Sequence, residues 1–454
     1  MKTGQFTFNR TLTAGLLAGA ALCAVPGTAA AQVNETGRVL DLPGDDEVSA
    51  PTAEMGAVVQ QVPGAGPMVQ SWTLSDAQAL LEVVDAIDAE GLNPDDYRPA
   101  QLRAAIAAGE GLTLDEEASN VFAWLVEDMR DGRTPMDARR QWFVVDPDPD
   151  VNPTPAVMAR ALATHDIAGT LMALAPEHPD YAKLKAELAK TTDAKKRKLI
   201  VANMDRWRWL GQELGTKYLL TNVPEYQLRL TVNDKIIRTY KTIVGKPGRT
   251  ATPQLAERVE GVIFNPTWTV PQSIVKGEGL GAKVLGNPAW AQRAGYKATK
   301  GDNGWVTVVQ QPGPSNALGL MKLDMPNEHA IFLHDTPSRG LFNSAGRALS
   351  HGCIRTERAT ELAITLAILQ GDMDAAEAVA IQKSGEYTRV GFEREMPVYI
   401  TYFTMGTDIT GKMATFADIY DRDAPVLASF DAPRERNRAR VTDEEVVAIE
   451  NGEL

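Results

Sequence analysis

The spacing of hydrophobic positions changes near residue 216, and this change divides the sequence into two parts. Between residues 72 and 210, apolar residues recur every three or four positions, as they do along one face of an α-helix. From residue 216 onward they alternate with polar residues, as in strands with one buried face. Short strands joined by turns, with a few helices, predict a mixed β-sandwich or distorted barrel. The expected fold class is therefore α+β, with an all-α domain at the N-terminal side.

The helical part, residues 72–210, is expected to form one domain. Its helices are predicted at 75–91, 102–106, 114–129, 157–174, 181–188 and 194–209. His165 and His178 have no neighbour in the sequence that could share a catalytic role, so surface or capping roles are favoured.

The second part, residues 216–430, is expected to form one domain built mainly of strands. Strands are predicted at 218–222, 227–232, 236–244, 263–271, 306–310, 330–334 and 397–403, with a further strand pair within 408–430. Helices are expected at 357–370 and 373–383. The stretch 272–305 is rich in glycine and polar residues, and insertions of this length often form active-site lids. The alternative is that this stretch has only a structural role and packs around its own aromatic residues.

The two ends of the chain have their own composition. Residues 1–31 read as an export signal, with Lys2 and Arg10 before an apolar stretch and small residues before Gln32. Residues 32–71 are predicted to be a flexible linker, and 431–454 a charged, disordered tail. No later segment has the ~18 consecutive apolar residues of a membrane span. A periplasmic location is therefore expected.

Charge and cysteine content narrow the possible functions. The net charge of −13 argues against nucleic acid and against an anionic membrane surface as partners. Of the two cysteines, Cys23 lies in the predicted signal, which leaves Cys353 as a single exported thiol. An unpaired thiol in an oxidising compartment is a liability unless it has a function.

Cys353 ends the segment Ser350-His351-Gly352-Cys353, and a second histidine, His334, lies upstream. Either imidazole could take the thiol proton, which makes this a candidate cysteine–histidine nucleophile. Because a helix is expected at 357–370, the thiol should lie at the helix mouth, where the dipole stabilises a thiolate and the N–H groups of Gly352 and Cys353 can form an oxyanion hole. The alternative is a small buried cysteine beside ordinary polar histidines.

This segment resembles the signature of the YkuD-type L,D-transpeptidases. The resemblance extends to residues 244–246, 265–271 and 313–322, and so covers roughly 217–402. The helical part is similar to the scaffold of the larger, YcbB-like members. Those members commonly insert a small peptidoglycan-binding domain into the scaffold, but only residues 190–193 separate the two helices here, so that module is expected to be missing.

The resemblance implies roles for individual residues. Cys353 would be the nucleophile and His334 the general base, held by the backbone carbonyl of Asp335, whose carboxylate would face solvent. His351 would be a supporting residue or the competing base. Substrate contacts are expected from Arg355, Ser350, Asn316 and Trp268, although Ser350 could brace the loop and Arg355 could neutralise a nearby acid.

The resemblance also implies a substrate and a reaction. The enzyme would join two peptidoglycan stem peptides, one as donor and one as acceptor, in a 3→3 cross-link between diaminopimelate residues, without metal or cofactor, and carbapenems would acylate its cysteine. The acceptor could instead be a lipoprotein, a free D-amino acid or water. Two other classes stay open: a cysteine hydrolase of muropeptides and a non-enzymatic wall-binding protein. Partners in cell-wall synthesis cannot be specified from the sequence.

Overall fold

The computed structural model describes residues 68–435 and 439–446. The predicted export signal and all but the last four residues of the predicted linker lie outside the described residues. In the described part, no helix has both the length and the apolarity needed to cross a membrane.

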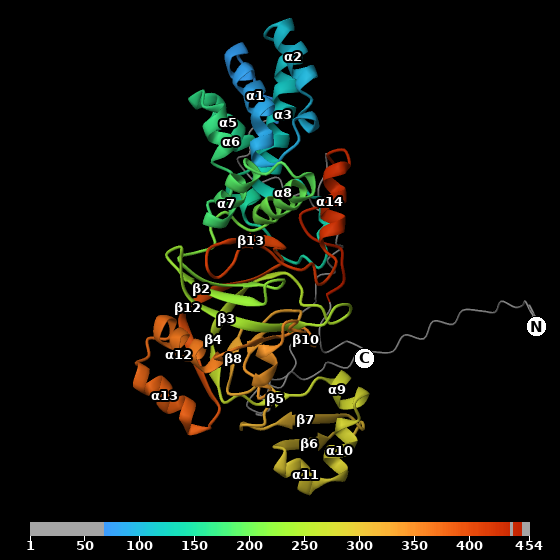
Figure 1. The fold of residues 1–454 in the computed structure, drawn as a ribbon, viewed down its shortest axis with the longest axis vertical. Helices are drawn as coiled ribbons and strands as arrows, with labels where there is room; N and C mark the ends of the chain where they lie inside the picture. Colours follow the sequence, from blue (N-terminus) through green and yellow to red (C-terminus); the bar gives the residue numbers. More distant parts are fainter. Residues whose placement is uncertain (1–67, 436–438, 447–454) are drawn as a thin grey trace, which may run out of the picture. The chain divides into compact units, whose positions relative to one another are not determined.

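The N-terminal part of the described chain is helical, as predicted (Figure 1). Its α-helices are α1 (Leu74–Ala86), α2 (Pro99–Ala108), α3 (Leu112–Asp131), α4 (Asp148–Val151), α5 (Thr154–Thr164), α6 (Ile167–Met172), α7 (Pro179–Leu188) and α8 (Ala194–Arg208). The helix predicted at 157–174 is in fact two helices, because His165 takes a left-handed conformation (φ 53°) and ends α5. His178 caps α7 by accepting from the N–H of Asp180, and His165 is exposed beside Asp76, which confirms the surface and capping roles.

Helix α3 lies at the centre of the first hydrophobic core. It contacts α1, α2, α5 and α6. Its Val121, Phe122, Leu125 and Met129 are fully buried there. Burial of this apolar face, rather than the propensity of any one helix, stabilises the arrangement.

The second part is built on one large mixed sheet. Its strands are β1 (Lys217–Asn222), β2 (Gln227–Val232), β3 (Lys235–Gly245), β4 (Leu255–Phe264), β8 (Met321–Asp324), β9 (Leu333–His334), β10 (Ala348–Ser350), β11 (Ile354–Thr356) and β12 (Thr388–Thr401), in the order β10-β3-β11-β9-β8-β4-β12-β1-β2. Strand β3 also pairs with β2 at the other end of this order, so the strands from β3 to β2 form a closed ring of hydrogen-bonded neighbours. Three pairs are parallel (β1–β12, β10–β3 and β11–β9) and the others are antiparallel. The α+β class is confirmed.

One face of this sheet encloses the main core. Helix α12 (Ala359–Gln370) contributes Leu362 and Leu366 to it, and α13 (Ala375–Ser384) packs beside α12 (Figure 1). Leu333 of β9 and Ile354 of β11 point into the same core. The opposite face of β9 and β11 is therefore free to carry polar side chains.

Three strand predictions were wrong in part. The strand expected at 263–271 is β4, which starts at Leu255 and lies between β8 and β12, with Asn265 (φ 49°) ending it before the prolines. The short β5 (Trp268–Thr269) follows separately. Only Leu333 and His334 of the range 330–334 are in a strand. Of the strand pair expected within 408–430, only β14 (Met413–Thr415) lies in that range; its partner β13 (Met405–Thr407) precedes it, and α14 (Asp423–Asp431) is a helix.

The predicted insertion is a small folded unit. It contains α9 (Gln272–Gly277), α10 (Leu280–Gly286), α11 (Pro288–Arg293), β6 (Tyr296–Lys300) and β7 (Val306–Gln310) (Figure 1). A three-stranded sheet, β5-β7-β6, packs with the helices around its own hydrophobic cluster, which includes Val270, Val284 and Val308.

The predicted disorder of the tail was wrong for its described residues. Arg434 is buried and pairs with Glu127 (2.5 Å) and Asp128 (2.9 Å) of α3. Glu444 accepts from the N–H of Gln141 (2.5 Å). The composition suggested disorder, but the charges of this segment have partners on other elements.

Candidate active site

Strands β9 and β11 bring the predicted catalytic residues together. They pair in parallel, with Arg355 opposite His334 and Ile354 opposite Leu333. Because Leu333 and Ile354 point into the core, His334 and Arg355 share the opposite face. Lys322 of β8 lies directly opposite His334 on the other side of β9, and Cys353 immediately precedes β11. Residues far apart in the sequence thus meet on three neighbouring strands.

The hydrogen bonding of His334 fixes its tautomer. The ring is buried, and its Nδ1 lies 2.5 Å from the backbone oxygen of Asp335. A carbonyl can only accept, so Nδ1 carries the hydrogen and Nε2 of the neutral ring keeps its lone pair. Burial, and then the charge of Arg355, lower the pKa of His334 to about 3. The ring is neutral at physiological pH, with Nε2 available as a base.

The carboxylate of Asp335 does not face solvent, contrary to the prediction. It is buried, accepts from the N–H of Leu320 (2.9 Å) and pairs with Arg339 (3.2 Å). Gly319 (φ 64°) lies so close that a Cβ there would meet the carboxylate oxygen at 2.4 Å. The carboxylate therefore ties the 313–319 loop to the strand that carries His334.

The environment of Cys353 differs from the expected helix mouth. Strand β11 follows the cysteine, and α12 begins only at Ala359. Burial raises the pKa of the thiol to about 11, although the N–H of Phe332 and the charges of Lys322 and Arg355 oppose this shift. The prediction of a thiolate stabilised by a helix dipole was wrong, because that dipole acts only within about one turn of the helix end.

Ser350 braces the loop that presents the cysteine. It is buried, and its hydroxyl donates to the carbonyl of Cys353 (2.6 Å) and accepts from the N–H of Gly352 (3.2 Å). Thr252 donates to the carbonyl of Gly352 (2.7 Å). Gly352 needs its freedom here, because its φ is 123°. Since its N–H is already engaged, Gly352 cannot serve as an oxyanion donor in this conformation. No sequence pattern pointed to Thr252.

His351 and Arg355 flank the cysteine. His351 is half-buried; burial lowers its pKa, Lys246 adds to this effect, and Glu278 of the insertion opposes it. The influence of Glu278 indicates that the insertion lies near this loop. Burial lowers the pKa of Arg355 and the nearby Cys353 opposes the shift. Among the described residues the guanidinium of Arg355 makes no hydrogen bond or ion pair, so a ligand carboxylate could take its donors.

Asn316, which was expected to bind substrate, is engaged elsewhere. It is fully buried, and its amide donates to the carbonyls of Pro266 (3.0 Å) and Gln311 (3.0 Å) and accepts from the N–H of Leu318 (2.8 Å). This prediction is corrected, because the side chain holds loops together. Trp268 is half-buried beside the hydrophobic cluster of the insertion, and its substrate contact stays a prediction.

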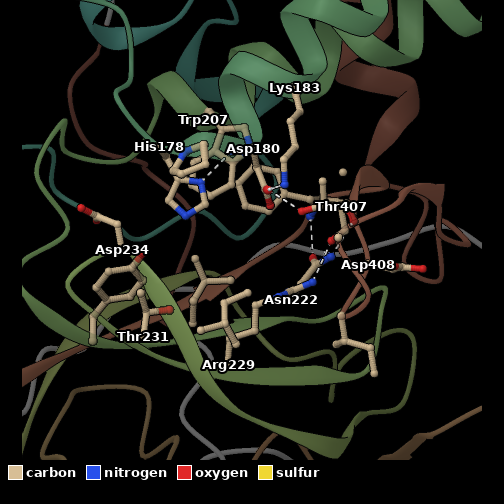
Figure 2. A pocket seen from close by; sticks show the side chains of 18 of the residues that line it. His178, Asp180, Lys183, Trp207, Asn222, Arg229, Thr231, Asp234, Thr407 and Asp408 are labelled. Carbon is tan, nitrogen blue, oxygen red and sulfur yellow. Dashed lines mark hydrogen bonds and ion pairs between the residues drawn. The ribbon is translucent and has the colours of Figure 1, made fainter.

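A well-formed pocket lies elsewhere on the chain (Figure 2). It has a volume of about 180 Å³, between the start of α7 and the strands β1, β2 and β13. Its lining includes His178, Trp207, Asn222 and Arg229, and none of the predicted catalytic residues. Several of its polar groups already pair with one another, for example Asp180 with Thr407. We do not assign catalysis to it. No cluster of side chains suited to a metal is found in the described ranges.

Comparison with known families identifies the two parts of the chain. Residues 216–400 match the family model of the L,D-transpeptidase catalytic domain (YkuD), and residues 70–188 match that of the scaffold domain. Residues 216–400 therefore form a YkuD-type L,D-transpeptidase catalytic domain, and the additional scaffold match is consistent with the YcbB-like subgroup. The resemblance predicted from the sequence is confirmed.

Individual relatives are distant. The chain is 29% identical over 223 residues to a provisionally named L,D-transpeptidase of Haemophilus influenzae, covering 46% of this chain and 45% of that protein. The chain thus spans less than half the length of this curated relative. Among solved structures, the L,D-transpeptidase from Mycobacterium smegmatis has 11% identity and a TM-score of 0.22, covering 41% of this chain and 58% of that one. L,D-transpeptidase 1 of Mycobacterium tuberculosis has 11% identity and a TM-score of 0.18, covering 41% and 61%. We draw no argument from these two structures.

Proposed function

We propose that the protein is a periplasmic peptidoglycan L,D-transpeptidase that forms 3→3 cross-links between diaminopimelate residues through a thioester on Cys353. The observation that supports this most strongly is the placement of Cys353 beside the strand pair that carries His334 and Arg355 on one face. The tautomer of His334 leaves Nε2 free to accept a proton.

In the first step, the Cys353 sulfur forms a bond to the stem-peptide carbonyl while its proton passes to Nε2 of His334. Because the pKa of the thiol is about 11 and that of His334 about 3, no stable thiolate–imidazolium pair forms beforehand. Proton transfer therefore accompanies attack. The peptide C–N bond then breaks, and the proton on His334 goes to the nitrogen of the departing D-amino acid.

In the second step, the amine of an acceptor stem attacks the thioester. It loses its proton to Nε2, the C–S bond breaks, and the thiol recovers the proton. The N–H of Cys353, which makes no hydrogen bond among the described residues, can stabilise the oxyanion in both steps. Arg355 and Lys322 supply positive charge for substrate carboxylates beside the sulfur.

The test is the muropeptide composition of cells that produce either the wild-type protein or Cys353→Ala, measured by mass spectrometry. We expect 3→3 cross-linked dimers only with the wild type, and a covalent adduct of a labelled carbapenem on Cys353 of the purified protein. Shortened stems without new dimers would show hydrolysis instead. Adduct formation at wild-type yield on Cys353→Ala would refute the nucleophile.

A further inference from the structure

The resting thiol of Cys353 contacts the backbone of another loop. Its sulfur lies 3.6 Å from the carbonyl oxygen of Ala330, in the connection between β8 and β9. Ala330 has a left-handed backbone (φ 52°), which is unfavourable for a residue with a Cβ and must be imposed by its surroundings. The direction of this carbonyl therefore depends on what holds the loop.

Two sets of contacts hold the loop between β8 and β9 in place. Within the loop, Asn327 donates to the carbonyls of Met325 (2.8 Å) and Ile331 (2.7 Å), and its own carbonyl accepts from the N–H of Ala330 (3.2 Å). From outside, the ring of His329 packs against the ring of Phe143, with centroids 4.2 Å apart. His329 is 5% exposed, and its Nδ1 is buried without a hydrogen-bond partner, so the ring is held by packing and not by polar contacts.

Phe143 does not belong to the sheet domain. It lies within residues 70–188, which match the scaffold domain. Residues 141–143 form a short bridge to the start of β4: the N–H of Phe143 donates to the carbonyl of Gln254 (3.0 Å), and the N–H of Gln254 donates to the carbonyl of Gln141 (2.9 Å).

Two neighbouring residues of this segment point into different cores. Trp142 is buried in the cluster that contains Trp209 at the end of α8, with ring centroids 5.4 Å apart. Phe143 packs against the core enclosed by the large sheet. Alternation along an extended segment thus links the two cores through consecutive side chains.

We propose that the scaffold positions the nucleophile: Phe143 holds the ring of His329, which fixes the left-handed Ala330, whose carbonyl holds the thiol of Cys353. Phe143 and His329 are then positioning residues, since neither touches the reacting atoms. The inference deepens the proposed function and rests on it for the acyl-transfer readout, but not for the readout of thiol reactivity. It gives the scaffold a specific task beyond stability.

The experiment compares Phe143→Ala and His329→Ala with Phe392→Ala in the full chain. Phe392 lies on β12 and packs against the same core from another strand, so its removal is a matched loss of one ring. One readout is the pH profile of iodoacetamide alkylation at Cys353, located by mass spectrometry. The other is the rate of acylation by a stem tetrapeptide, with its concentration dependence.

In both variants, alkylation of Cys353 should become easier at a given pH, whereas acylation by the stem peptide should become slower. A carbonyl beside sulfur favours the protonated thiol, so its displacement should shift the alkylation profile of Phe143→Ala and His329→Ala to lower pH. Acylation should slow by about 10-fold at saturating peptide, because the sulfur is no longer held in place for attack. Phe392→Ala should leave both readouts near wild type even if its melting temperature falls. His329→Phe, which keeps a ring but lacks the nitrogens, should restore both.

Identical profiles for Phe143→Ala and Phe392→Ala would overturn the proposal, as would His329→Phe behaving like His329→Ala. If Phe143→Ala does not fold, the pair His329→Ala and His329→Phe decides alone. A shifted alkylation profile in a protein that never accepts stem peptides would retain the positioning role and reject the proposed function.

Discussion

At the scale of single residues, the ionisation of the Cys353–His334 pair decides how the site can work. Both groups are neutral at physiological pH, because burial lowers the pKa of the imidazole to about 3 and raises that of the thiol to about 11. In the proposed mechanism the base therefore acts during attack and not before it.

The first prediction concerns pH dependence. The rate of carbapenem acylation should stay level between about pH 5 and pH 9, since neither group titrates there, and should rise as the thiol ionises at higher pH. His334→Ala should lower the plateau by ~10²–10⁴-fold, the usual contribution of a general base. Stopped-flow measurements from pH 4 to 10 test this; an acid limb near pH 6–7 that disappears in His334→Ala would contradict it.

The second prediction tests whether Asn316 holds loops together or contacts the substrate. Asn316→Ala removes the amide to which three carbonyls and one N–H are hydrogen-bonded. It should therefore reduce the free energy of unfolding by roughly 1–3 kcal/mol. Chemical denaturation measures the loss. The fraction that remains folded should keep the wild-type KM for stem peptides, and a raised KM without loss of stability would restore a substrate role.

At the scale of elements, the folded insertion is the feature that we propose to take part in substrate binding. Its strands β5 and β7 pair next to the point where it leaves the main sheet, with Thr269 opposite Val309. The N–H of Val270 also donates to the carbonyl of Val308 (2.9 Å). Residues 271–307 could thus be replaced by a two-residue Asn-Gly turn that closes the hairpin.

The third prediction uses this replacement. A long stem peptide needs a covered groove, whereas a small β-lactam needs mainly the nucleophile, base and oxyanion donor. The shortened protein should therefore lose acylation by stem peptides at least about 10-fold more than acylation by a carbapenem. The measurement is the ratio of the two rates. An unchanged ratio would mean that the insertion is structural and that the stem is held elsewhere.

At the scale of the whole molecule, charges of the C-terminal segment bind it to the first helical core. Arg434 and Asp128 are both buried, with side chains 3% and 0% exposed, whereas the Arg440–Asp150 pair in the same segment is exposed. These two arginines offer a matched comparison, because only the first forms its ion pair in a buried environment.

The fourth prediction follows. Arg434→Ala should destabilise the protein by about 3–5 kcal/mol, since it breaks an ion pair with the buried carboxylate of Asp128. Arg440→Ala should cost less than about 1 kcal/mol, as exposed ion pairs do. Thermal and chemical denaturation of both variants test the difference. Equal effects would show that the segment contributes little at Arg434.

The sequence by itself determined the division into a helical part and a strand-rich part, because each element type has its own hydrophobic period. It also singled out Cys353 and His334 as candidate catalytic residues, and the resemblance predicted the contact of His334 with the backbone carbonyl of Asp335 that the structure shows, since the motif is local and specific.

Only the tertiary structure decided the surroundings of those residues. Three features depend on the way the chain folds around them: the burial of the thiol, the ion pair of Asp335, and the hydrogen bonds that occupy the amide of Asn316. The same is true of the ring contact between Phe143 and His329 and of the ion pair between Arg434 and Asp128. A local pattern reports which face of an element is apolar, but not which other element covers it. For that physical reason the sequence could suggest the candidate catalytic residues, while only the fold shows how they are held and how their pKa values shift.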